Sequence, residues 1–247
     1  GFENLLVRDC GLLVEKGNVA AYSTGLTQIL DNVDLAQRLA KQGQAIVKEE
    51  LSFYHYLFDL MQFGGAFLPK VSVVIPNYNY EKYIESRLTS VFSQTYPIFE
   101  IIVLDDKSTD NSVKKIEEVL KRTNIPSKLI VNETNSGSVF KQWRRGAEIA
   151  SGDLLWIAEA DDLAEPTFLE KLVHQYQDSD VVMAFSQSKQ IDQDSIKLAD
   201  DYKEYTSDIG DYWEEDYIIE GSDEIKRALC VKNTIPNVSG AIFRRDP

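Results

Sequence analysis

The chain has almost no cysteine. Its 247 residues include only two, Cys10 and Cys230, which lie far apart and without paired spacing. This argues against a disulfide framework or a zinc site and is typical of a protein in a reducing compartment. A signal peptide and an apolar run long enough to span a bilayer are also lacking, so we expect a soluble, cytoplasmic protein.

Basic residues are scarce as well. There are 26 Lys and Arg against 40 Asp and Glu, which gives a net charge of −14 and a pI near 4.6. Nucleic acid is therefore not an expected partner, because its phosphates need a basic surface. An anionic ligand stays open, since a divalent cation can bridge acidic protein to phosphate.

Two regions differ in apolar periodicity. Up to about residue 67 apolar residues recur mostly every three or four positions, which predicts helices. Gly64, Gly65 and Pro69 mark the end of this pattern. We therefore expect a helical segment over residues 1–67 and a second domain over residues 68–247.

After Pro69, continuous β-branched runs alternate with amphipathic helical patterns. Strands are predicted over 71–77, 99–106, 127–132, the run leading into 156–162, 180–185 and 238–245. Helices are predicted between them, two of them around 140–150 and 168–176. Such alternation predicts an α/β fold with a mostly parallel sheet and helices on both faces. Residues 193–224, acidic and aromatic with weak periodicity, read as an irregular excursion or a flexible loop.

Polar residues follow three of the predicted strands, as PNYN, LDDKSTD and EADD. Ligands of open α/β sheets bind at the carboxyl ends of strands. Asp105 and Asp106 close the second strand and suit a pyrimidine imide N–H or ribose hydroxyls. An equally weighted alternative is that the pair caps a helix opening near Ser108 and Thr109.

The run WIAEADD places three carboxylates, Glu159, Asp161 and Asp162, within four residues. Carboxylates spaced in this way suit Mg²⁺ or Mn²⁺, which take one or two of them and complete their shell with water and phosphate. The alternative interpretation is an acidic turn that caps the helix after Pro166.

Several motifs together carry a family resemblance. VSVVIPNYNYEKYIESRLTSVFSQTYPIFEIIVLDDKSTDNS, then NSG, then ASGDLLWIAEADD resembles a family 2 glycosyltransferase of the GT-A fold, a Rossmann-like fold. The similarity covers about residues 70–186, with a weaker echo at VSGAIFRR. It implies a UDP- or dTDP-sugar donor, a saccharide or lipid-linked saccharide acceptor, and Mg²⁺ or Mn²⁺ as cofactor. Peripheral association with a membrane, at its inner face, is compatible with such an acceptor.

The resemblance assigns roles to single positions. Pro76 and Tyr78 match residues that flank the nucleotide base, and Asp106 matches the aspartate that reads the imide edge of uracil or thymine. Asp161 and Asp162 match the motif that contacts ribose and holds the metal on the diphosphate. Glu159 stands where the family often has Asp, so we expect it to act on the metal indirectly.

The segment QWRRG, Gln142 to Gly146, replaces the ARNxG of many relatives. We expect at least two of Lys141, Arg144 and Arg145 to lie on a solvated helix face rather than at the diphosphate. Together with WIAEADD, QWRRG is similar to transferases that build bacterial surface polysaccharides.

The family implies inverting displacement assisted by a carboxylate base downstream of the strand that VSGAIFRR matches. We therefore expect the base beyond Pro247 and assign no catalytic residue in this chain. Glu214, Glu215 and Asp216 fit a solvated acidic loop better. His55 and His174 lie on helical patterns and are expected to be structural or surface residues.

The helical segment carries a second resemblance. EKGNVAAYSTGLTQILDNVDLAQRLAKQG, with GLLVEKGN before it, resembles the last helices of a GT-B glycosyltransferase such as those of family 4. Glu3 then stands at a donor-binding position that is inactive without the rest of that domain. The alternative is a helical extension of the second domain itself.

Two other functional classes stay open. A non-catalytic nucleotide-sugar-binding or assembly module would bind the donor without transferring sugar. A sugar-nucleotide nucleotidyltransferase shares the layered fold but needs a basic, glycine-rich phosphate loop near the first strand, and VSVVIPNYN has none.

Overall fold

The computed structural model describes residues 10–49 and 53–245. The chain divides into two compact units, Gly1–Ala66 and Phe67–Pro247. Glu3 lies outside the described residues, and so does the side chain of His55.

The first unit is helical, as predicted. It contains α2 (Val19–Asp31), α3 (Val33–Glu49) and α4 (Phe53–Phe63). Asparagines start the first two helices: Asn18 Oδ1 accepts from the Ala21 N–H at 2.9 Å, and Asn32 Oδ1 accepts from the Leu35 N–H at 2.9 Å. The origin of this unit in a GT-B tail stays a prediction.

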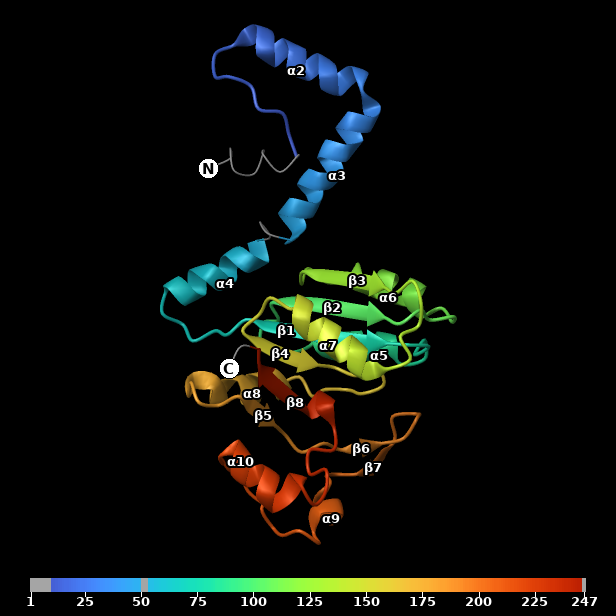
Figure 1. Ribbon diagram of the computed structural model, residues 1–247, viewed down its shortest axis with the longest axis vertical. Coiled ribbons are helices and arrows are strands. Elements are labelled where there is room, and N and C mark those ends of the chain that lie inside the picture. The colour runs from blue at the N-terminus through green and yellow to red at the C-terminus, as the bar shows by residue number, and fades with distance from the viewer. Residues whose placement is uncertain (1–9, 50–52, 246–247) are drawn as a thin grey trace. The chain divides into compact units, whose positions relative to one another are not determined.

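A six-stranded sheet forms the centre of the second unit, in the order β3-β2-β1-β4-β8-β5 (Figure 1). Its strands are β1 (Val71–Asn77), β2 (Glu100–Asp105), β3 (Ser127–Val131), β4 (Leu154–Ile157), β5 (Met183–Phe185) and β8 (Ala241–Arg244). The first four are parallel, and β8 runs antiparallel to both β4 and β5. The predicted α/β fold with a mostly parallel sheet is confirmed.

Helices cover both faces of this sheet. On one face α7 (Val139–Ile149) packs on a buried apolar cluster; its sheet members are Val74, Ile102, Leu104, Leu155 and Ile157. A Cβ on Gly146 would lie 2.3 Å from Val74 Cγ1, so only glycine allows this close approach.

The opposite face carries α5 (Ile84–Phe92) and α8 (Phe168–Val173), with α6 (Ser112–Leu120) beside α5. Trp156 points to this face because side chains alternate along β4. Its ring lies 5.0 Å from that of Phe168 in α8, centroid to centroid.

Some predicted boundaries move. The strand predicted over 180–185 begins only at Met183, and the helix predicted around 168–176 ends at Val173 and continues as the short turn η1 (His174–Gln177). Within the segment predicted as a strand over 238–245, η3 (Val238–Gly240) is a 3-10 turn and β8 starts at Ala241. Asn237 Oδ1 accepts from the Ser239 N–H at 2.8 Å, which favours the turn.

The acidic and aromatic segment is an irregular excursion with short elements. These are β6 (Gln190–Ile191) and β7 (Lys197–Ala199), which pair with each other, then α9 (Lys203–Thr206) and α10 (Gly221–Glu224), which leads into the π-helical turn η2 (Ile225–Leu229). Trp213 is buried, and the Arg227 guanidinium lies 4.3 Å from the Tyr212 ring centroid and 4.8 Å from that of Tyr217.

Candidate functional site

The loops that follow β1 and β2 are hydrogen-bonded to each other. Asn77 Nδ2 donates to Asp105 Oδ2 at 2.7 Å, and Asn79 Oδ1 accepts from the Thr109 N–H at 2.7 Å. Glu81 accepts from the N–H of Asn111 at 3.1 Å. Most polar residues of PNYNYE and DDKSTDN therefore hold the carboxyl ends of these two strands together.

Asp105 is fully buried and structural. Its carboxylate accepts from the Ser108 N–H at 2.8 Å and from the Ser108 hydroxyl at 2.6 Å. The alternative interpretation correctly predicted a contact between Asp105 and Ser108. It wrongly predicted that a helix starts there. The helix α6 begins later, at Ser112, and Asn111 precedes it as the cap residue.

Asp106 turns the other way, towards α7. Its Oδ1 accepts from Asn132 Nδ2 at 2.6 Å, the Ser136 N–H at 2.8 Å and Gln142 Nε2 at 2.9 Å. Its Oδ2 accepts one bond, from the Ser136 hydroxyl at 2.7 Å. The carboxylate is only 6% exposed, and Oδ2 retains acceptor capacity for one further donor.

The acidic turn follows β4 at the same edge of the sheet. The Asp162 N–H donates to the Glu159 carbonyl at 3.2 Å, which closes the turn. The helix α8 starts at Phe168 after Thr167, whose side chain makes no capping bond. Within the described part of the chain no hydrogen bond joins this turn to α8, so the helix-capping interpretation is wrong.

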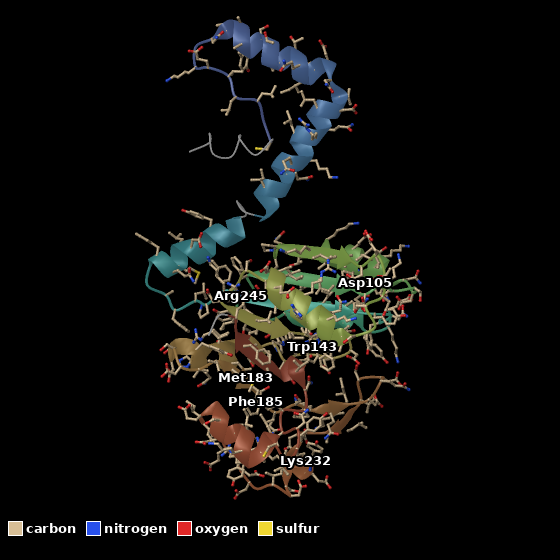
Figure 2. The ribbon with its side chains drawn as sticks, in the orientation of Figure 1. Asp105, Trp143, Met183, Phe185, Lys232 and Arg245 are labelled. Atoms are coloured by element: carbon tan, nitrogen blue, oxygen red, sulfur yellow. The ribbon has the colours of Figure 1, made fainter. Side chains whose placement is uncertain are left out.

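Glu159 is held by two partners from distant parts of the sequence. Trp143 Nε1 in α7 donates to Glu159 Oε1 at 2.5 Å, and the Glu159 N–H donates to the Ser239 hydroxyl at 2.9 Å. Burial raises the pKa of Glu159; the Trp143 bond lowers it, and the charges of Asp161 and Asp162 raise it further. Figure 2 labels Trp143 on α7 and Asp105 at the end of β2.

Asp161 is exposed and Asp162 is half-buried. Burial raises the pKa of the Tyr80 hydroxyl. The charge of Asp161, a hydrogen bond between Tyr80 and Asp161, and the charges of Glu159 and Asp162 raise it further. The Tyr80 hydroxyl, which follows the end of β1, therefore lies within the electrostatic field of the three carboxylates.

Arg87 lies on the opposite face of the sheet from Trp143. It belongs to α5, is 0% exposed, and its guanidinium carbon is 4.9 Å from the Trp156 ring centroid. Its Nε, Nη1 and Nη2 have no hydrogen-bond partner among the described residues. Burial lowers the pKa of Arg87 to about 10, against the opposing charges of Asp162, Glu159 and Asp161.

The remaining predicted positions lie around these groups. Pro76 is buried in β1, and Tyr78, which follows the strand, is 45% exposed and accessible to a ligand. On α7, Arg144 is exposed and pairs with Glu148 at 2.8 Å, Lys141 is exposed, and Arg145 donates to Asn132. Two of these three cations thus lie on the solvated face, as expected.

Other candidate groups stand apart from the site. Glu214, Glu215 and Asp216 are exposed, and Glu214 pairs with Lys203 at 2.7 Å. His174 is exposed in η1.

The acidic turn fits a substrate-bridged cation and not an all-protein cage. No group of three or more Asp, Glu, His or Cys in the described ranges 10–49 and 53–245 has metal-holding geometry. Mg²⁺ and Mn²⁺ often bind through one or two carboxylates, with water and phosphate completing the shell. Asp161 and Asp162 supply that minimum.

Sequence reasoning missed Arg87, Asn132 and Ser136. Arg87 had a visible signal, because it lies within the apolar face formed by Ile84, Leu88 and Val91, where a charged residue is unexpected. Asn132 lies in a loop whose pattern carried no such mark. Ser136 lies within the motif NSG, which gave it no role of its own.

Comparison with known proteins identifies the family. The model for glycosyl transferase family 2 matches residues 72–247, well over half of the chain. The chain belongs to this family, and the resemblance noted in its motifs is confirmed.

Several relatives are named glycosyltransferases. An uncharacterised glycosyltransferase of Nostoc sp. is 33% identical over 156 residues, which cover 58% of this chain and 47% of the relative. The poly(ribitol-phosphate) β-N-acetylglucosaminyltransferase TarS of Staphylococcus aureus is 37% identical over 95 residues, 38% of this chain and 16% of TarS.

The crystal structure of S. aureus TarS in complex with UDP shares the fold, with a TM-score of 0.51 and 21% identity over 71% of this chain and 47% of that one. The chain spans about half the length of the curated relatives it matches over most of its own length. Among the described residues, every helix is too short or too polar to cross a membrane.

Proposed function

We propose that the chain transfers a sugar from a UDP- or dTDP-linked donor to a saccharide acceptor, with inversion at the anomeric carbon and with Mg²⁺ or Mn²⁺ at the diphosphate. One observation carries this proposal. Two consecutive residues of α7, Gln142 and Trp143, hold Asp106 beyond β2 and Glu159 beyond β4. The helix α7 thus bonds both to Asp106, the carboxylate suited to a nucleotide base, and to the turn suited to a metal-bound diphosphate.

In this proposal the uracil or thymine ring of the donor lies beside Pro76 and Tyr78 and donates its imide N–H to Asp106 Oδ2. That oxygen accepts a single bond within the protein, whereas Oδ1 accepts three. Donors fix the carboxylate from several sides, so it is already oriented before a nucleotide arrives. A cytosine edge, which lacks the imide proton, leaves the second acceptor position of this buried oxygen without a donor.

Asp161 and Asp162 would hold the cation, with Asp161 also near the ribose. When bound there, a divalent ion neutralises charge on the leaving diphosphate. Glu159 would shape the turn from its bond to Trp143, and Tyr80 would restrain Asp161. The acceptor hydroxyl displaces the nucleoside diphosphate, and the base that takes its proton is left unassigned.

Relatives favour a bacterial surface polymer as the product. TarS is named for the transfer of N-acetylglucosamine to poly(ribitol-phosphate), and it matches this chain over 95 residues. We extend that class to this chain: a cytoplasmic donor and a saccharide or lipid-linked saccharide acceptor at the membrane face.

Calorimetry with UDP, dTDP and CDP in the presence of Mg²⁺ tests the site. UDP or dTDP should bind at least about tenfold more tightly than CDP, because only the imide N–H fills the second acceptor position of the buried Asp106 Oδ2. Asp106→Ala should remove that preference, whereas the charge-matched control Asp200→Asn on the exposed surface should keep it. Equal affinity of the wild type for all three nucleotides would refute the role given to Asp106.

Transfer is tested separately, with radiolabelled UDP-sugars and oligosaccharide acceptors. Sugar incorporation that depends on Mg²⁺ or Mn²⁺ supports the transferase. Tight donor binding without transfer, in a protein that also contains the base expected beyond Pro247 and under conditions in which a TarS-type enzyme turns over, would favour the binding module instead.

A further inference from the structure

The acidic turn contains more negative charge than its own hydrogen bonds account for. Glu159 is half-buried and has one side-chain donor, Trp143, while Asp161 and Asp162 lie beside it. Like charges this close in the sequence repel one another, and partial burial of Glu159 and Asp162 strengthens the repulsion. A fold that keeps such a turn before any ligand binds needs a compensating charge nearby.

Arg87 is a positive charge without a hydrogen-bond acceptor among the described residues. It is fully buried, and none of its three guanidinium nitrogens has a hydrogen-bond partner among the described residues. Buried charged groups are normally paired, because an unpaired one is expensive. Its guanidinium stacks 4.9 Å from the ring centroid of Trp156, in the strand that leads into the acidic turn.

We propose that Arg87 is a built-in counter-cation of the acidic turn: it positions Asp162 and Glu159 before a metal binds and weakens the affinity of the turn for free divalent ions. The guanidinium is too deeply buried to reach a ligand itself. It therefore acts through the carboxylates, and it is a positioning residue and not a catalytic one. The effect on metal affinity rests on the metal site proposed above, whereas the pairing of charges does not.

Two consequences follow from simple electrostatics. Without Arg87 the carboxylates repel one another unopposed, so the metal-free protein loses stability. The same loss of positive charge makes the turn more attractive to a cation, because the field of one unit charge is removed. Before a metal–diphosphate complex binds, Arg87 would hold the acids close together and keep free metal affinity low.

A double-mutant cycle tests the pairing without any ligand. The unfolding of wild type, Arg87→Met, Asp162→Asn and the double variant is measured in denaturant without divalent metal. Asp162→Asn should offset part of the loss caused by Arg87→Met, so that the two effects on the unfolding equilibrium constant differ from additivity by at least about fivefold. Additivity within twofold would overturn the proposal, because a packing role alone predicts no coupling.

Arg244→Met is the matched control. Arg244 also stacks on an aromatic ring, with its guanidinium carbon 5.3 Å from the Tyr176 centroid. It pairs in register with Leu154, at the opposite end of β4 from the acidic turn. Its substitution should be additive with Asp162→Asn.

Should Arg87→Met fail to fold, the Arg87 side chain can be observed in place. Its Nε–H resonance, assigned by its absence from Arg87→Lys, should shift on Asp162→Asn and stay unchanged on Asp180→Asn at the exposed surface. An unchanged resonance in both variants would contradict the pairing.

Mn²⁺ binding in the absence of nucleotide, followed by electron paramagnetic resonance, tests the second part. Arg87→Met should bind Mn²⁺ at least about fivefold more tightly than wild type, and Arg244→Met should equal wild type. Weaker or equal binding by Arg87→Met would refute the effect on the metal. Coupling in the cycle, together with no Mn²⁺ binding by any variant either without nucleotide or with UDP, would instead refute the proposed metal site while supporting the charge pair.

Discussion

The ends of β2 and β4 lie at the same edge of one sheet and are both rich in aspartate, yet they are built differently. Beyond β2, Asp105 and Asp106 are buried and accept hydrogen bonds from several fixed donors. Beyond β4, Asp161 is exposed, Glu159 has one side-chain donor, and the nearby Arg87 is unpaired among the described residues. The carboxylates of the first end are held in place without a ligand, while the second end holds charge that a cation would neutralise.

The largest expected effect comes from removing one negative charge from the β4 end. Asp162→Asn should lower the affinity for UDP in the presence of Mg²⁺ by more than about a hundredfold, because the ion loses a carboxylate ligand. Calorimetry checks this, with the exposed Asp200→Asn as the charge-matched control.

Glu159→Gln, measured in the same way, distinguishes an indirect role on the metal from direct binding. Its amide oxygen can still accept from Trp143, so affinity should fall by only about tenfold, as for a group that acts on the metal indirectly. A larger loss in Glu159→Gln than in Asp162→Asn would reverse the assigned roles.

The same substitution should act oppositely on stability at the two ends. Asp106→Asn should reduce the free energy of unfolding by about 2–4 kcal/mol, because an amide cannot accept from the four donors that surround the carboxylate. Asp161→Asn should change it by less than about 0.5 kcal/mol or raise it, since it relieves repulsion at an exposed position. Denaturant unfolding of both variants without metal checks the contrast; equal losses would contradict it.

The bond between Trp143 and Glu159 is the one side-chain anchor of the acidic turn to α7 among the described contacts. Trp143→Phe keeps an aromatic ring and removes the N–H donor, which should cost about 1–2 kcal/mol of unfolding free energy. Phe140→Leu is the control, because it alters the ring that packs edge-on against Trp143, at 4.9 Å between centroids, and leaves the donor in place. A greater loss in the control would show that packing, and not the hydrogen bond, dominates.

A smaller effect concerns Glu100, at the start of β2. Burial alone would raise the pKa of this carboxyl, but bonds from Ser151 and Ser72 and the charge of Lys128 bring it below its ordinary value. A lowered pKa means that Glu100 stabilises the fold fully above its unfolded pKa of about 4.3 and loses this contribution as the pH falls through the lower folded pKa.

Glu100→Gln should therefore flatten the acid limb of unfolding free energy against pH, measured between about pH 3 and 7. The exposed Glu118→Gln should leave that limb unchanged. Identical limbs in Glu100→Gln and wild type would contradict the assignment.

The smallest expected effect comes from removing the helical unit. If residues 1–66 are a separate unit, residues 67–247 expressed alone should keep the UDP affinity of the whole chain within about twofold, measured by calorimetry. A folded 67–247 protein that no longer binds UDP would favour one integrated domain.

Much of the fold could be read from the sequence because its signals are local. The run 71–77 is rich in β-branched residues, and β1 spans those residues and is buried throughout. The amphipathic helices and the order of strands and helices follow from the same periodicity. Boundaries failed where a side chain outside the pattern intervened, as at Val238–Gly240, where Asn237 stabilises a turn.

The site could be predicted only in part. The motif order located Asp106, Asp161 and Asp162 at strand ends, and the parallel sheet brings those ends to one edge. The sequence could not show that Asp105 bonds to Ser108 and Asn77 while Asp106, its neighbour, bonds to residues 132–142. Adjacent side chains diverge at the end of a strand, and their partners come from different loops.

The alternation of strands and helices, the polar strand ends and the excess of acid follow from residue type and spacing alone. Which charges are satisfied depends on contacts that form only in the folded chain. Arg87 and Trp143 approach the acidic turn from helices on opposite faces of the sheet, one stacked on Trp156 and the other bonded to Glu159. Electrostatic compensation depends on distance and burial in the folded chain, and neither is encoded in a local pattern.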